Sequence, residues 1–167
     1  MRAMKKFRKV FIVFIGIVIT ILAAAWFTAS SLIRPSNHAV NPPPANLPCT
    51  VVSFTSGSGA TIQGWYMPLA GAHKAALLLH PSGGDRTSML SYARFLRPAG
   101  FACLTIDFRA HGESTGAERT FGWQESKDAI SAVAWLRHTI PDTKVIVIGT
   151  SLGGAAALLA KGDLHAD

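Results

Sequence analysis

The stretch from Lys144 to Ala160, KVIVIGTSLGGAAALLA, constrains the fold more than any other part of the sequence. An apolar run of strand length ends at Gly149, and an alanine- and leucine-rich run of helical character follows. Between them, residues 149–153 fit the pattern Gly-x-Ser-x-Gly. Such a serine sits at a sharp strand-to-helix turn, and the flanking glycines leave room for both backbones. The pattern therefore favours Ser151 as a nucleophile; the alternative is a glycine-rich turn whose serine only caps the helix.

The chain from residue 50 onward alternates short buried strands with helices. We expect strands at 50–56, 60–68, 74–80, 101–107 and 144–149, the first two forming a hairpin, and helices at 86–99, 123–139 and 151–160. Buried strands that alternate with helices predict an α/β fold, with a mostly parallel sheet and helices on both of its faces.

A serine nucleophile also needs hydrogen-bond donors for the oxyanion that develops during its attack. One donor is the backbone N–H that follows the nucleophile, here that of Leu152. The second is expected in the loop after the third strand, HPSGGDR, at residues 80–86. Gly83 and Gly84 would let the backbone of this loop approach a substrate closely.

Three motifs, LLLHPSGGDR, IDFRAHGES and VIGTSLGG, occur in the order and spacing typical of the serine α/β-hydrolase superfamily. The sequence resembles in particular the membrane-anchored bacterial members of its serine-aminopeptidase-like and acyl-esterase-like branches. The resemblance covers residues 50–163 and corresponds to the N-terminal half of such a domain. It implies an α/β-hydrolase fold and hydrolysis through an acyl-enzyme.

The resemblance also implies roles for individual residues. Ser151 matches the nucleophile, and the N–H groups of Leu152 and Ser82 match the oxyanion hole. Two positions depart from the usual pattern, since Pro81 and Ala110 stand where glycine is common. The supporting residues would be the elbow glycines Gly149 and Gly153, His80, which orients the oxyanion loop, Gly83 and Gly84 within that loop, and His111, which packs a turn.

The catalytic acid and base are expected to be missing. In this fold they follow the serine in the order Asp or Glu, then His, and only Asp163, His165 and Asp167 carry such groups after Ser151. His165 comes mostly through a helix, which places it roughly 15–20 Å from the serine. We therefore expect a fold truncated after the nucleophile helix, with the third motif strand as an uncovered apolar edge of the sheet.

The N-terminus carries a membrane signal. A basic tail, residues 1–9, precedes an apolar run of 18 residues, Val10 to Phe27, and no further charge occurs before Arg34. A membrane-spanning helix needs about 20 such residues. We expect an uncleaved signal anchor with one transmembrane helix at 10–33, the N-terminus in the cytoplasm and the domain outside; export after cleavage is the lesser alternative. A proline-rich spacer, 34–48, would lead to the partial hydrolase domain, 49–167.

Composition argues against several other classes of function. The formal net charge of +7 arises mostly in the N-terminal tail, so no nucleic-acid surface is indicated. Cys49 and Cys103 make neither a disulfide framework nor a zinc pattern, and no metal or organic cofactor is implied. The expected partners are the membrane and a small-molecule ester, thioester or peptide substrate. The alternative is a non-catalytic membrane protein, a decayed or repurposed hydrolase fragment with a binding role.

Overall fold

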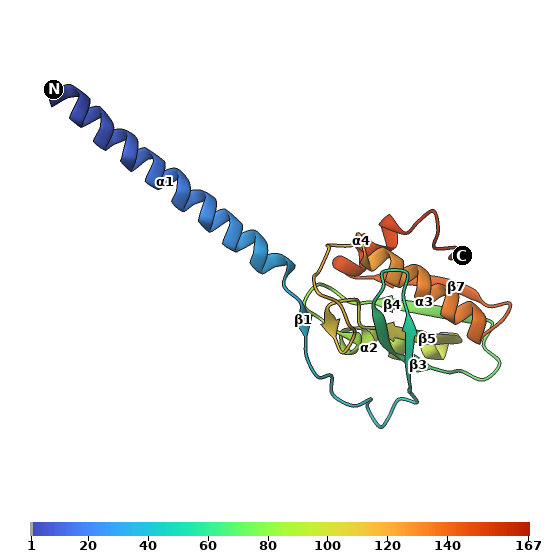
Figure 1. Cartoon of the computed structure of the whole chain (residues 1–167). Helices are drawn as coiled ribbons and strands as arrows, with labels where there is room; N and C mark the ends of the chain where they lie inside the picture. Colours follow the sequence, from blue (N-terminus) through green and yellow to red (C-terminus); the bar gives the residue numbers. More distant parts are fainter. Residues whose placement is uncertain (1) are drawn as a thin grey trace. The chain divides into compact units, whose positions relative to one another are not determined.

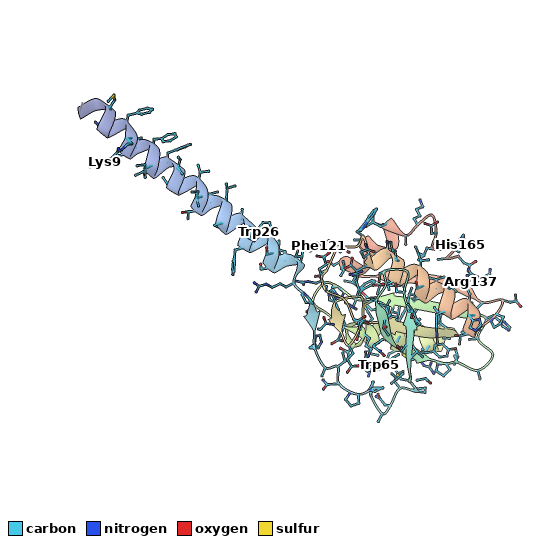
Figure 2. All side chains as sticks on the ribbon, viewed as in Figure 1. Lys9, Trp26, Trp65, Phe121, Arg137 and His165 are labelled. Carbon is cyan, nitrogen blue, oxygen red and sulfur yellow. The ribbon has the colours of Figure 1, made fainter. Side chains whose placement is uncertain are left out.

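A computed structural model describes residues 2–167, which fall into two units that divide between Arg34 and Pro35. The first unit is one helix, α1 (Arg2–Ile33) (Figure 1). Its span from Lys6 to Ile33 is long and apolar enough to cross a membrane, and its apolar window is not buried within the chain. Figure 2 shows Lys9 and Trp26 on this helix, one near each end of the apolar run. A signal sequence meets the same criteria of length and composition.

The second unit is built on a five-stranded sheet of order β2-β3-β5-β4-β7. β2 and β3 form the predicted antiparallel hairpin, β3 pairs antiparallel with β5, and β4 pairs parallel with both β5 and β7. Each strand lies within one residue of its predicted bounds, so the α/β prediction is confirmed. The strands are β2 (Thr50–Thr55), β3 (Thr61–Met67), β4 (Lys74–Leu79), β5 (Phe101–Ile106) and β7 (Lys144–Gly149).

Helices cover both faces of this sheet, as Figure 1 shows. Along β4, Leu77 and Leu79 pack into a core cluster with α3 and α4, whereas Ala76 and Leu78 pack into a second cluster with α2. Successive strand residues face opposite sides. From Ala75 to Leu79, β4 is apolar and buried, as expected for a strand covered on both sides. The helices are η1 (Arg86–Met89), α2 (Leu90–Leu96), η2 (Arg97–Ala99), α3 (Glu125–Thr139) and α4 (Leu152–Leu159).

β7 forms one edge of the sheet, as predicted for the third motif strand. On its outer side, the Val145 N–H donates to the Asp167 carboxylate at 2.8 Å, and the Asp167 N–H donates to the Val145 carbonyl at 2.8 Å. Within residues 2–167, no strand pairs with this side of β7. An open apolar groove of about 400 Å³ beside the edge is lined by Ser91, Tyr92, Phe95, Leu96 and Ile148.

The proline-rich segment that was predicted as a spacer is attached to the sheet unit from Pro35 onward. Its strand β1 (Ser36–Asn37) pairs parallel with β6 (His111–Gly112), which belongs to the loop after β5. Leu47, farther along, is buried in the cluster with α2. The prolines remove N–H groups, but Ser36, His38 and Val40 keep theirs and donate them to this loop. In the structure, the proline-rich segment from Pro35 onward is therefore packed against the sheet unit and is not a separate spacer.

Candidate active site

Ser151 lies at a strained turn between β7 and α4. Its φ and ψ angles are 51° and −109°, a conformation that costs free energy for a residue with a side chain. A Cβ on Gly149 would lie 2.3 Å from the Gly153 carbonyl carbon, and a Cβ on Gly153 would lie 2.3 Å from the Leu79 carbonyl oxygen. Both glycines are therefore required because backbones pass where a side chain would begin. This is the geometry of a nucleophile elbow.

The loop after β4 lies beside this turn. Leu79, the last residue of β4, pairs in register with Gly149, and its carbonyl accepts the Thr150 N–H at 3.1 Å. Ser82 and Ser151 thus follow neighbouring parallel strands at the same edge of the sheet. In the described residues, neither the Ser82 N–H nor the Leu152 N–H donates a hydrogen bond to the protein. Within residues 2–167, both N–H groups therefore lack a protein acceptor.

Two glycines shape the Ser82 loop. Gly83 has a φ of 76°, a conformation that side chains rarely adopt. A Cβ on Gly84 would lie 2.8 Å from the Ser88 hydroxyl and 3.1 Å from the Pro81 carbonyl oxygen. The Gly84 N–H donates to that carbonyl at 3.0 Å. Pro81 lacks an N–H, yet its carbonyl organises the turn.

His80 is fully buried and is held as a neutral ring. Its Nδ1 lies 2.7 Å from the Pro81 carbonyl, which can only accept, and its Nε2 lies 3.0 Å from the Phe108 N–H, which can only donate. The proton is therefore on Nδ1. Burial is the main cause that lowers the pKa of His80 from 6.5 to about 4. With both nitrogens engaged, His80 braces the loop that contains Ser82 against the loop after β5.

His111 is also fully buried, and its ring lies 5.0 Å from that of His80. Its Nδ1 donates to the Arg109 carbonyl at 2.8 Å. Its Nε2 has no hydrogen-bond partner in the described part of the chain. Burial lowers the pKa of His111 and favours the neutral ring.

A buried ionic network under the two loops was not predicted from the sequence. Arg86 donates its backbone N–H to Asp107 Oδ1 at 2.7 Å and its Nη1 to Oδ2 at 2.6 Å, while its Nη2 pairs with Glu113. Its guanidinium lies 5.0 Å from the ring centroid of Trp65, which Figure 2 labels in the sheet unit. Asp107 also accepts the Glu113 N–H at 2.9 Å. The network joins the start of η1 to the loop after β5.

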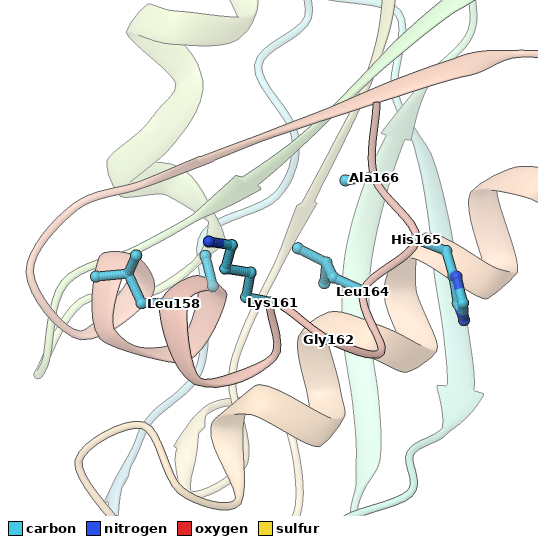
Figure 3. A pocket seen from close by; sticks show the side chains of 7 residues that line it. Leu158, Lys161, Gly162, Leu164, His165 and Ala166 are labelled. Atoms are coloured by element: carbon cyan, nitrogen blue, oxygen red, sulfur yellow. The ribbon is translucent and has the colours of Figure 1, made fainter.

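The Ser151 hydroxyl makes no hydrogen bond to an imidazole or a carboxylate within residues 2–167. His165 lies at the far end of α4, where its carbonyl accepts from Arg137 at 2.6 Å. It lines a pocket of about 350 Å³ between α4 and the C-terminal residues (Figure 3). At 1.5 Å per residue along α4, that pocket is roughly 10–15 Å from Ser151.

The described residues contain no group of three or more His, Cys, Asp or Glu side chains placed to hold a metal ion. Cys49 is half-buried and Cys103 is buried, and both are free thiols.

Comparison with known proteins agrees with this geometry. Residues 76–166 match the model of the alpha/beta hydrolase family. The esterase Pf2001 of Pyrococcus furiosus is 30% identical, with a TM-score of 0.67 over 76% of this chain and 51% of that one. A dienelactone hydrolase from Anabaena variabilis is 29% identical, with a TM-score of 0.57 over 68% of this chain and 56% of that one.

A curated relative is the uncharacterized protein YfhR of Salmonella typhimurium. It is 26% identical over 162 residues, which make up 93% of this chain and 54% of that protein. The chain thus spans about half the length of the curated relatives that it matches over most of its own length. With the family model matching more than half of its residues, the chain belongs to the alpha/beta hydrolase family.

Proposed function

We propose that the protein is a membrane-anchored serine hydrolase that cleaves esters through an acyl-enzyme at Ser151. The observation that supports this most is the strained turn at Ser151, whose flanking glycines face backbone atoms at 2.3 Å. A chain bears such strain where the surrounding structure enforces it, and strained residues cluster at active sites. The serine is exposed beyond the carboxyl ends of the parallel strands β4, β5 and β7, where substrates can reach it.

In the proposed reaction, the Ser151 oxygen adds to the carbonyl carbon of the substrate. The resulting oxyanion accepts hydrogen bonds from the N–H groups of Leu152 and Ser82. The serine proton passes through a general base to the leaving alkoxide, and water then hydrolyses the acyl-enzyme. Since His80 and His111 are buried neutral rings, the proposal assigns neither of them as the base. Residues 2–167 supply the nucleophile and the oxyanion donors.

Carboxylic esters are the preferred substrate class. Two structural relatives, 30% and 29% identical to this chain, are described as an esterase and a dienelactone hydrolase. Both names denote cleavage of an acyl–oxygen bond. Thioesters and peptides share the same oxyanion chemistry and stay within the proposal as weaker substrates.

The first prediction concerns labelling by a fluorophosphonate probe, which phosphonylates activated serines. The full chain, solubilised in detergent, should be labelled slowly, because residues 2–167 bring oxyanion donors but no base to Ser151. Ser151→Ala should lose the label because its nucleophilic oxygen is gone. Ser82→Ala is the matched control, since it removes a hydroxyl and keeps the N–H that the proposal uses. It should label at about the wild-type rate.

A folded sample that takes up no label would overturn the enzymatic proposal and favour a non-catalytic binding role. Urea unfolding with a cooperative transition establishes that the sample is folded. Label that survives in Ser151→Ala would assign the nucleophile to another residue. Hydrolysis of a short-chain p-nitrophenyl ester that is faster than hydrolysis of the matching anilide would support the preference for esters.

A further inference from the structure

His38 is placed so that both of its ring nitrogens face groups that can only accept. Its Nδ1 lies 2.9 Å from the Ser36 carbonyl, and its Nε2 lies 2.9 Å from Asp85 Oδ2. Neither a carbonyl nor a carboxylate carries a proton to donate, so both nitrogens need an N–H. The arrangement is complete only when His38 is an imidazolium. His80 is the opposite case, because one of its nitrogens accepts from a backbone N–H.

Asp85, the partner of His38, fixes the end of the loop that contains Ser82. Its Oδ1 accepts the Thr87 N–H at 2.7 Å and the Thr87 hydroxyl, and its own N–H donates to the Ser88 hydroxyl at 3.3 Å. These bonds form the N-terminal cap of η1. One carboxylate oxygen thus caps the helix, while the other binds His38.

The segment around His38 is in turn fixed to the loop after β5. The Ser36 N–H donates to the Ala110 carbonyl at 2.7 Å, and the His38 N–H donates to the Gly112 carbonyl at 2.9 Å. The Asn37 side chain donates to the Ser114 carbonyl at 2.6 Å. His38 therefore bridges the loops after β4 and β5, at the carboxyl ends of the parallel strands, where Ser151 also lies.

We propose that His38 is a positioning residue which, as an imidazolium, clamps the Ser82 loop through Asp85, so that the alignment of the oxyanion donor depends on a proton. The inference rests on the proposed function, because it concerns the Ser82 N–H. It links the segment that follows α1 to the chemistry of the domain. The clamp makes the site responsive to the pH of the compartment that surrounds the domain.

The hydrogen bonds around His38 favour its protonated form. The hydrogen bond to Asp85, followed by that to the Ser36 carbonyl, raises the pKa of His38. Burial alone would raise the pKa of Asp85, but the bonds from Thr87 and His38 outweigh it and lower that pKa. The ion pair between His38 and Asp85 is therefore fully formed below the ordinary pKa of histidine. It is lost as pH rises through the raised value, because the neutral ring keeps a single N–H and no charge. The other titratable groups nearby are Asp107 and Glu113, each of which pairs with Arg86, and the buried rings of His80 and His111.

The second prediction tests the clamp without requiring catalysis. By NMR, the His38 ring of the full chain in detergent should titrate above its ordinary pKa, and Asp85→Asn should move the titration back toward 6.5. Asparagine is also a good helix cap, so this variant should fold. In hydrogen exchange at pH 5.5, His38→Gln should lower the protection of amides 82–88 by about threefold, as expected for a half-exposed ion pair. At pH 8.5 the variant and the wild type should agree.

His73→Gln is the matched control, because His73 is exposed in the loop before β4 and its side chain makes no hydrogen bond within residues 2–167. It should match the wild type at both pH values. The clamp is overturned if His38 titrates identically in wild type and Asp85→Asn, or if His38→Gln leaves protection unchanged at pH 5.5.

The effect of His38 on the reactivity of Ser151 is measured separately, by the rate of fluorophosphonate labelling. The ratio of wild-type to His38→Gln labelling rates at Ser151 should be about 3 at pH 5.5 and about 1 at pH 8.5. Equal rates at pH 5.5 would remove His38 from the chemistry even if the exchange data show the clamp. If no variant is labelled but His38 titrates above its ordinary pKa and Asp85→Asn reverses the shift, the proposed function is refuted and the clamp is retained.

Discussion

Gly153 occupies a point where no side chain fits, and this makes a third prediction. The Cβ of Gly153→Ala would lie 2.3 Å from the Leu79 carbonyl oxygen and 2.7 Å from its carbonyl carbon. These are backbone atoms of a central strand and cannot move aside. We expect a loss of about 3 kcal/mol in the free energy of unfolding, measured by urea titration.

Gly154→Ala is the matched control for that substitution. Its Cβ would lie 3.4 Å from the Gly149 carbonyl oxygen, an ordinary contact. Because alanine favours a helix over glycine by about 1 kcal/mol, this variant should be as stable as the wild type or more stable. Equal effects from the two substitutions would contradict the tight packing of the elbow against β4.

His80 gives a fourth prediction, on the dependence of stability on pH. Its folded pKa of about 4 lies below the unfolded value of 6.5, so the unfolded chain binds more protons between these values. The contribution of the neutral His80 ring to the free energy of unfolding is therefore fully present above pH 6.5 and is lost as pH drops toward 4. The shift corresponds to about 3 kcal/mol. In His80→Asn, which cannot protonate, the free energy of unfolding should fall less over this range.

Urea titrations from pH 4 to 7.5 would measure this difference. The variant will be less stable overall, since the Phe108 N–H loses its acceptor, so the comparison concerns slopes and not absolute values. His111, whose pKa is also lowered by burial, contributes a residual slope of the same sign in both proteins. Identical slopes would show that His80 is not buried as a neutral ring.

At the scale of the elements, local patterns predicted most of the sheet. β4, β5 and β7 are short apolar runs bounded by glycine or polar residues, and such runs favour buried strands. The predicted helix at 86–99 instead consists of η1, α2 and η2. Pro98 and the left-handed Gly100 close its last turn. A helical period predicts where a helix lies, but not how tightly its ends are wound.

The parts of the site that escaped prediction depend on contacts between distant residues. The elbow and the Ser82 loop are compact motifs, so their residues can be read from spacing alone. Arg86 and Asp107 are 21 positions apart, and His38 and Asp85 are 47 positions apart. No periodicity in the sequence relates such pairs. His38 lies among prolines, where a solvated residue is the ordinary expectation, and only the pairing of β1 with β6 brings it to the loop.

At the scale of the whole molecule, the chain combines an apolar helix with a sheet unit whose β7 edge is open. Phe95 is 77% exposed and lines the groove beside that edge. Ile148, across the groove, is only half-buried. Exposed apolar groups beside the outer side of an edge strand favour association with another polypeptide.

The position of the sheet unit relative to a membrane yields the fifth prediction. We propose that α1 is an anchor with its basic end in the cytoplasm, because basic residues are retained on that side. Cys49 would then face outward. It is half-buried and should react with a membrane-impermeant maleimide in intact cells, whereas the buried Cys103 should not. The chain should also stay in the membrane fraction after alkaline carbonate extraction.

Cys49→Ser is the control, since it should abolish labelling in intact cells. Labelling of Cys49 only after the cells are permeabilised would place the domain in the cytoplasm and contradict the proposed orientation. Replacing the four basic residues Lys5, Lys6, Arg8 and Lys9 with glutamine should weaken the preference for one orientation, because it removes most of the charge that fixes it. The labelled fraction in intact cells should then fall. Release of a labelled, shortened chain into the soluble fraction would instead identify α1 as a cleaved signal.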